Sequence, residues 1–137
     1  MNLIHYIDRT NLFRFIFFIL SIFLVFVSCT DNLSNCKKVD QNVIIYPDYT
    51  GITIPCNIAP LNFVVREPAS KYVAIYNFKS KEIFRVSSDN GEISVPANDW
   101  KNLLKEANGQ EFTIDICLKK LDSWVKYNAI INKISAD

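Results

Sequence analysis

The chain has 137 residues, half of them hydrophobic, and its 15 basic and 14 acidic side chains leave a formal net charge of +1. This balance gives neither a basic stripe for nucleic acid nor an acidic tail for a cationic partner. The single histidine, His5, lies close to the N-terminus, so the rest of the chain has no Ser–His or Cys–His dyad and no histidine ligand for zinc or haem.

An apolar run begins the chain after Arg9 and Arg14. It covers residues 15–27, has 13 residues of which 12 are apolar, and ends at Ser28-Cys29. A membrane-spanning helix needs about 20 apolar residues, so this run is too short to be typical of one. Positive charge, a short apolar core and a small residue before cysteine are typical of a signal peptide whose cleavage exposes the cysteine for lipid attachment.

We therefore predict a lipoprotein signal peptide over residues 1–28, lipidation at Cys29, and a protein anchored by lipid in the bacterial cell envelope, at the outer membrane. Phe26 stands where the lipoprotein motif usually has Leu. The alternatives are an uncleaved anchor or plain secretion.

Removal of residues 1–28 leaves 109 residues, which is the size of one domain with a small core. The leader holds two of the basic and one of the acidic residues, so 13 of each remain. Residues 29–41 are polar and lack periodicity, and we predict a flexible tether there. Residues 42–137 form the predicted domain.

Four cysteines are present, and with Cys29 acylated at most one disulfide can form among Cys36, Cys56 and Cys117. Export implies an oxidising compartment, but the spacing does not assign the pairing. The absence of any CxxC pair gives no support for a thioredoxin-like motif or a metal site, and we predict no cofactor. In the alternating run 112–118, Cys117 lies on the face opposite the apolar residues. Its thiol is either a disulfide partner or part of a partly covered sheet face, and we favour the second.

Short runs of β-branched and aromatic residues dominate the predicted domain and indicate strands. They cover residues 43–46, 52–54, 62–66, 72–78, 82–86, 93–95, 112–118 and 124–134. Lys79-Ser80-Lys81 predicts a tight hairpin, and Asp89-Asn90-Gly91 predicts a second hairpin turn. The last pair of strands is joined around residues 121–123.

One segment has helical periodicity. Trp100, Leu103, Leu104 and Ala107 fall on one face, Asn98 or Asp99 is the expected N-cap, and Gly109 is the expected end. Trp100 is either a ligand platform or a core residue, and we favour the core because a short helix needs its apolar face buried. The strand count predicts a mainly β fold, an antiparallel sandwich of immunoglobulin or fibronectin type III style with one short helix after the helix of the signal peptide.

Residues 46–63 are the least generic part of the chain. Three prolines within this segment hold the chain extended and remove ladder donors, which predicts a strand that switches between two sheets. A functional interpretation is that the segment presents a docking surface for a partner. Its predicted residues are Tyr46, Pro47, Tyr49, Pro55 and Pro60.

The same segment, with Trp100-Lys101-Asn102-Leu103-Leu104 and Trp124-Val125-Lys126-Tyr127, resembles the N-terminal region of large bacterial TolB-like lipoproteins. The resemblance covers about residues 42–137. In that family an immunoglobulin-like domain precedes a β-propeller, often with a CxxCH haem-attachment motif, and some members carry names that suggest cytochrome c biosynthesis. The resemblance implies an envelope domain that precedes a propeller.

The sequence departs from that family because it has no CxxCH motif and no propeller repeats. We expect a truncated or split version of such a lipoprotein. The favoured function is a lipid-anchored, non-catalytic binding or scaffolding module whose partners are the membrane, through its lipid, and an unknown protein. The alternative is an accessory fragment of a haem or cytochrome c system. An enzyme would have to use a carboxylate pair, and the candidates Asp48, Glu67, Asp89, Glu92 and Asp99 lie in predicted turns.

Overall fold

The computed structural model describes residues 9–23 and 32–136, and it divides into two units, 1–32 and 33–137. The described part of the first unit is helix α1 (Arg9–Phe23) and Asn32. No helix in the described ranges is both long and apolar enough to cross a bilayer. Cys29 and the cleavage site predicted beside it lie outside the described residues.

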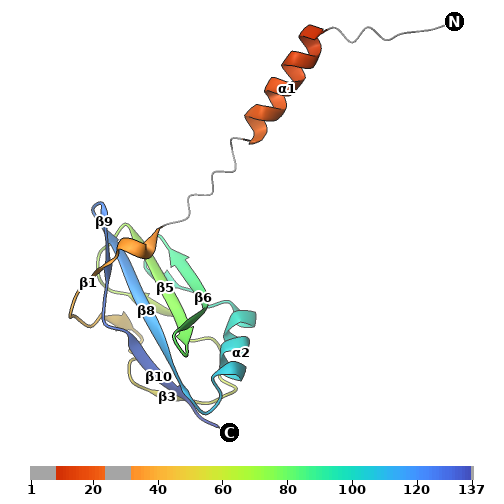
Figure 1. Cartoon of the computed structure of the whole chain (residues 1–137). Coiled ribbons are helices and arrows are strands. Elements are labelled where there is room, and N and C mark those ends of the chain that lie inside the picture. The colour runs from red at the N-terminus through yellow and green to blue at the C-terminus, as the bar shows by residue number, and fades with distance from the viewer. Residues whose placement is uncertain (1–8, 24–31, 137) are drawn as a thin grey trace, which may run out of the picture. The chain divides into compact units, whose positions relative to one another are not determined.

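The second unit is mainly β, as predicted, and contains two sheets and one α-helix in its described part (Figure 1). A short 3₁₀ turn, η2 (Leu33–Asn35), precedes the strands. The elements that follow are β1 (Lys37–Lys38), β2 (Ile45–Tyr46), β3 (Thr53–Ile54), β4 (Phe63–Val65), β5 (Lys71–Phe78), β6 (Lys81–Ser88), β7 (Glu92–Ile93), α2 (Ala97–Glu106), β8 (Glu111–Lys120), β9 (Ser123–Lys126) and β10 (Ile130–Ile134).

The larger sheet is organised around β8. One edge of β8 pairs with β5, and β6 pairs with the far edge of β5. The other edge of β8 pairs with β9 and with β10 in succession. The outermost places on that side belong to β1, which pairs with β9, and β3, which pairs with β10. These two outer pairs are parallel, so the prediction of a purely antiparallel sandwich was wrong at this edge.

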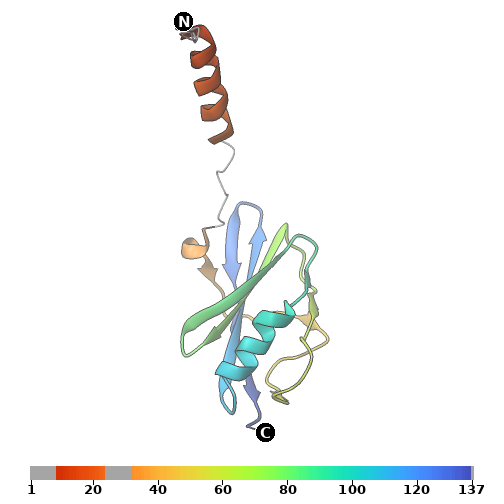
Figure 2. The same cartoon turned by 90° about the vertical axis from the view of Figure 1, so that its right-hand side faces the viewer.

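The smaller sheet has the order β2-β4-β7 and packs with α2 on one face of the larger sheet. Figure 2 shows α2 lying across the strands of that face. The core joins residues of β5 and β8 on the large sheet to residues of the small sheet and to the buried side of α2. Alternation along the strands explains this arrangement, because every second residue of a strand faces the same side.

Both predicted turns exist, but only one is a hairpin. Lys79 and Ser80 adopt positive φ values of 50° and 63° and join β5 directly to β6. At residues 89–91 the chain instead leaves the large sheet, because β7 pairs with β4 and not with β6. The Ser88 hydroxyl accepts a hydrogen bond from the Gly91 N–H (3.1 Å), and Val65 N–H donates to the Gly91 carbonyl (2.9 Å). These bonds turn the chain toward β4.

Two predicted boundaries need correction. The predicted strand 124–134 is interrupted at residues 127–129 and forms β9 and β10. The predicted tether 29–41 is ordered in its last part, since β1 pairs with β9 and Val39 N–H donates to the Lys126 carbonyl (3.0 Å). Val39 also packs against the core. Because Val39 packs against the core, the polar residues that precede it are held in an ordered conformation.

Helix α2 confirms the predicted core role of Trp100. The indole is 1 % exposed, meets Tyr76 and Phe112 edge to face, and donates its Nε1–H to the Ile58 carbonyl (3.0 Å). The predicted side-chain cap is absent, because the helix begins at Ala97 after Pro96, whose side chain has no capping hydrogen bond. Burial of this face therefore holds the helix in place without a polar cap.

Two tyrosines of β5 differ in how their hydroxyl groups are satisfied. The Tyr72 hydroxyl accepts from the Ala69 N–H and donates to the Glu67 carbonyl, both at 2.9 Å. The Tyr76 hydroxyl is buried and has no hydrogen-bond partner among the described residues, and burial raises its pKa above the ordinary value. A buried hydroxyl without a partner costs free energy relative to an apolar group.

We predict that Tyr76→Phe leaves the free energy of unfolding unchanged or raises it by up to ~1 kcal/mol, because it removes an unpaired polar atom. Tyr72→Phe is the matched control and should lower it by about 1–3 kcal/mol, because it leaves two backbone groups unpaired. Urea unfolding of both variants measures the difference. A larger loss in Tyr76→Phe than in Tyr72→Phe would contradict this account.

Candidate functional site

The segment from β2 to β3 carries the chain from one sheet to the other. Ile45 and Tyr46 pair with β4 in the small sheet, and eight residues later Thr53 and Ile54 pair with β10 in the large sheet. The predicted switch between sheets is therefore confirmed. Between the two strands the Tyr46-Pro47 peptide is cis, and Gly51 adopts a positive φ of 65°. Glycine accommodates that conformation without a Cβ clash.

A buried amide fixes the returning part of the segment. Asn132 of β10 is 2 % exposed and is the buried polar residue of the described core. Its Oδ1 accepts from the Ile52 N–H (3.0 Å), and its Nδ2 donates to the Tyr49 carbonyl (2.8 Å). Asn132 thus binds two backbone groups that no neighbouring strand pairs with, and it fixes where the chain rejoins the large sheet.

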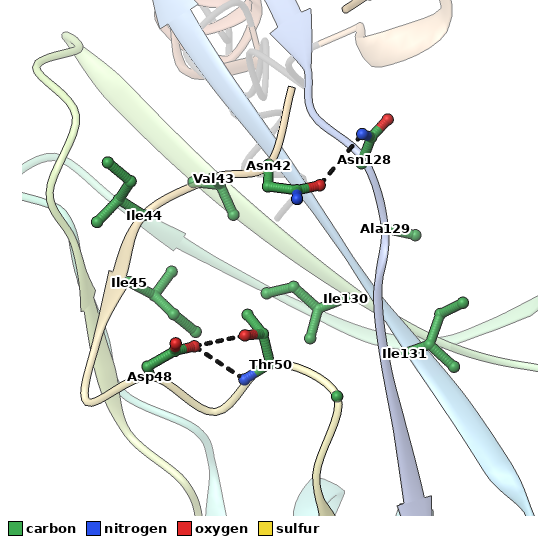
Figure 3. A pocket seen from close by; sticks show the side chains of 11 residues that line it. Asn42, Val43, Ile44, Ile45, Asp48, Thr50, Asn128, Ala129, Ile130 and Ile131 are labelled. Atoms are coloured by element: carbon green, nitrogen blue, oxygen red, sulfur yellow. Dashed lines mark hydrogen bonds between the residues drawn. The ribbon is translucent and has the colours of Figure 1, made fainter. Parts of the chain in front are cut away.

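A groove open to solvent lies where the segment has left the large sheet. It has a volume of about 530 Å³ and is lined by Asn42, Val43, Ile44, Ile45, Asp48, Thr50, Gly51, Asn128, Ala129, Ile130 and Ile131. We call it the switch groove. Figure 3 shows Ile45 and Ile130 pointing toward each other across it. Val43, Ile45 and Ile130 are each 5 % exposed, so the floor is apolar and continuous with the core.

Polar interactions close the two ends of the switch groove (Figure 3). At one end the Asn128 Nδ2 donates to Asn42 Oδ1 (3.1 Å). At the other, Asp48 Oδ1 accepts from the backbone N–H (3.1 Å) and the hydroxyl (2.5 Å) of Thr50. These bonds, the hydroxyl first, lower the pKa of Asp48 below its ordinary value. Asp48 is also the one ionisable side chain in the lining.

Both long sides of the switch groove are strand edges that the described strands leave open. β2 is an outer strand of the small sheet and pairs only with β4. On β10, the partner β3 reaches only Lys133 and Ile134. Ile134 N–H bonds to Gln110 on the β8 side and Lys133 N–H to Ile52 on the outer side, so alternation turns the N–H and C=O of Ile131 toward the outer edge.

The predicted docking residues do not line this groove. Tyr46 and Pro47 are exposed beside it, and the Tyr46 ring carries the Arg66 guanidinium 5.1 Å from its centroid. Tyr49 is half-buried and packs against the core. Pro55 and Pro60 lie further along the chain, outside the lining residues. None of the five residues is therefore among those that line the switch groove, and a docking surface formed by them stays a prediction.

Sequence reasoning missed the contribution of residues 128–131. Ile131 is 52 % exposed and Ile44 is 64 % exposed, so each side of the groove presents an exposed isoleucine. The available signal was Asn128, a polar residue that interrupts an otherwise strand-like run. That signal marks a break in the strand, but it does not say which segment lies opposite.

The candidate carboxylates serve local interactions or lie at the surface. Glu67 accepts a hydrogen bond from the Tyr127 hydroxyl and pairs with Lys120 (3.2 Å). Asp89 and Glu92 are exposed, and Asp99 lies in the first turn of α2. Within residues 9–23 and 32–136, no group of three or more His, Cys, Asp or Glu side chains lies close enough together to hold a metal ion.

The three described cysteines are free thiols in this structure. Cys56 packs beside the core and lines a second depression with Lys101 and Leu104 of α2. Cys117 lies on β8 and faces away from the core cluster, as the alternation predicted, but it is buried. Cys36 lies just before β1 and is half-buried.

Comparison with protein-family models, with curated proteins and with solved structures found no match to this chain. The resemblance to TolB-like lipoproteins thus has no support beyond the residues that suggested it.

We predict that Asn132→Ala lowers the free energy of unfolding by about 2–3 kcal/mol, because it leaves the Ile52 N–H and Tyr49 carbonyl without their partner. The control is Asn128→Ala. The hydrogen bonds from the Asn128 side-chain amide to Asp40 and Asn42 are exposed and should contribute at most ~0.5 kcal/mol to the free energy of unfolding. Urea unfolding distinguishes the two. Equal losses would show that Asn132 does not fix the switch.

Proposed function

We propose that this chain is an exported, lipid-anchored, non-catalytic domain of the cell envelope that binds an extended segment of a partner protein in the switch groove. The anchor is Cys29, which the leader of residues 1–28 precedes. Two sheets that share one core favour a sandwich of immunoglobulin or fibronectin type III style. The parallel outer pairs and α2 are additions to that pattern.

The observation that carries the proposed binding mode is the pair of open strand edges beside an apolar floor. An extended peptide that lies along an open edge gains backbone hydrogen bonds, and pockets for its alternate side chains give specificity. Here the outward N–H and C=O of Ile131 supply the backbone groups. Val43, Ile45 and Ile130 supply the apolar contact for one side chain of the peptide.

The chemistry of the lining favours binding over catalysis. Asp48 is its single ionisable residue, and its carboxylate is already engaged by Thr50. General acid–base catalysis needs a positioned acid and base, and the lining offers no second group to fill that role. A largely uncharged groove favours an uncharged, apolar segment of the partner, since no ion pair within the groove would repay the desolvation of a charge.

The anchor is tested by fatty-acid labelling of the full chain in a bacterial host. We expect label on the unaltered chain and on Cys36→Ala, and loss of label in Cys29→Ala, because only the cysteine after the signal peptide is acylated. Equal label in the unaltered chain and Cys29→Ala would refute lipidation at Cys29.

The groove is tested by a photo-crosslinking amino acid placed at Ile44 in the full chain, with Leu121 as the control site. Leu121 is 94 % exposed and lies in the turn between β8 and β9, outside the groove. We expect an adduct with an envelope protein from position 44 and none from 121. The same adduct from both positions would show that the capture does not depend on the groove.

A backbone variant sharpens that test. Ile131→Pro removes the outward N–H while the hydrogen bonds of β10 to β8 are made by its neighbours, and Ile131→Val keeps the N–H. We expect the yield of the adduct from position 44 to fall at least ~10-fold with proline, because proline removes a backbone hydrogen bond and disturbs the strand edge. The yield should persist with valine. Unchanged capture in the proline variant would reject strand addition at this edge.

A further inference from the structure

The face of the large sheet that turns away from the core carries a buried thiol. Cys117 is only 2 % exposed, yet it does not belong to the core cluster. Its neighbours in sequence, Ile116 and Leu118, do belong to that cluster. The Cys117 side chain therefore points to the opposite face, together with Thr113 and Asp115. A buried residue on that face requires a covering segment.

The register of the sheet places the segment that enters the domain on the far side of β9 from Cys117. Cys117 lies directly opposite Lys126 of β9, and on its other side Lys126 lies opposite Lys38 of β1. Cys36 stands two residues before Lys38, at the end of the η2 turn, where its N–H donates to the Leu33 carbonyl (3.3 Å). Residues that lie directly opposite each other share a face of the sheet, so β1 and η2 place Cys36 beyond β9, near the face to which Cys117 points.

The Cys36 side chain is close enough to Cys117 to affect its titration. Burial raises the pKa of Cys117 to about 12, and the charge and hydrogen bond of the neighbouring Cys36 thiol add to the shift, while Lys126 opposes it. Cys56 is placed differently, because it packs beside the core on the side of α2. Position therefore singles out one pair among the three described cysteines.

We propose that Cys36 and Cys117 form a disulfide in the exported protein, which ties the residue that enters the domain to its central strand. This proposal rests on the export that the proposed function includes, because a cytosolic chain would stay reduced. The structure then represents the reduced form, with both thiols in place for oxidation.

The bond forms by exchange with a donor disulfide of the envelope, which is the oxidant. The half-buried Cys36 sulfur, as thiolate, attacks the donor disulfide and releases one donor thiol, giving a mixed disulfide. The Cys117 sulfur, once deprotonated, then attacks the Cys36 sulfur and releases the second donor thiol. Two protein S–H groups become one S–S bond, and the donor takes up the two electrons and two protons.

The bond would change how the domain is held by its anchor. Without it, the connection from Cys29 reaches the sheet through β1, which has two paired residues at an outer edge. With it, the connection reaches β8, whose two edges pair with β5 on one side and with β9 and β10 on the other. A pull from the membrane would then act on β8, which is paired along both edges, and not on the two-residue strand β1.

The test in cells uses the full chain, expressed with its leader, and a thiol-reactive polyethylene glycol applied after acid denaturation. We expect Cys36 and Cys117 to resist labelling until reduction, and Cys56 to be labelled throughout. Mass spectrometry of unreduced peptides should show the 36 and 117 peptides joined and two hydrogens lighter than their sum. A bridge that includes Cys56 in the exported chain would overturn the pairing.

A second arm separates failure of the bond from failure of export. The purified full chain, reduced in detergent, is equilibrated with oxidised and reduced glutathione. A bond between Cys36 and Cys117 that forms here, while the chain in cells stays reduced, supports the pairing and counts against export. Failure to form the bond at any glutathione ratio rejects the proposal.

Variants give an independent readout. Reduction should lower the melting temperature of the unaltered chain and of Cys56→Ser by on the order of 10 °C, since the bond closes a loop of about 80 residues. Reduction should leave the melting temperatures of Cys36→Ser and Cys117→Ser unchanged. Cys36→Ser is the milder variant because Cys36 is half-buried, so it keeps the test valid if Cys117→Ser fails to fold. If reduction still lowered the melting temperature of Cys36→Ser, the proposal would be rejected.

Discussion

The length of β8 is the constraint on which the rest of the domain depends. Its ten residues, Glu111–Lys120, present a continuous apolar face to the core and need partners along both edges. β5 satisfies one edge nearly throughout. The other edge is shared by β9 and β10, which are separated by residues 127–129. Because of that break, two different strands lie outermost on this side of the sheet: β1 pairs with β9, and β3 pairs with β10. The chain between β1 and β3 crosses to the small sheet, where β2 pairs with β4.

The switch groove follows from this division. Because Ile45 and Tyr46 pair with β4, the edge of β10 around Ile131 has no neighbouring strand, and Asn132 holds the chain where it returns to the large sheet. The same layout puts the entering residue Cys36 near the face to which Cys117 points, because β1 is the only outer partner of β9 in the described sheet. The proposed binding edge and the proposed disulfide are thus two consequences of one broken outer strand. The proposed edge would bind the partner, and the proposed disulfide would tie the domain to its proposed lipid anchor.

Local patterns predicted the elements better than the connections between them. The strand runs, the hairpin at Lys79-Ser80 and the buried face of α2 depend on neighbouring residues, and the structure confirms them. The turn at residues 89–91 was predicted with the wrong partner, because its glycine and asparagine fix a reversal of the chain but not the sheet that the chain joins next. The tether was misjudged at β1 because a two-residue strand has no pattern, and its order depends on an edge formed by residues far along the chain.

The sequence by itself determined a mainly β domain without histidine, a helix buried through Trp100, and a proline-rich segment that switches sheets, and it predicts a leader for export. These features follow from composition and short-range periodicity, which act within one element. The tertiary structure alone decided that Ile44 and Ile131 border one groove, that Asn132 clamps the switch, and that Cys36 and not Cys56 lies with Cys117. Those residues are separated by some 80 positions or more, and only the register of β8 with its neighbours brings them together.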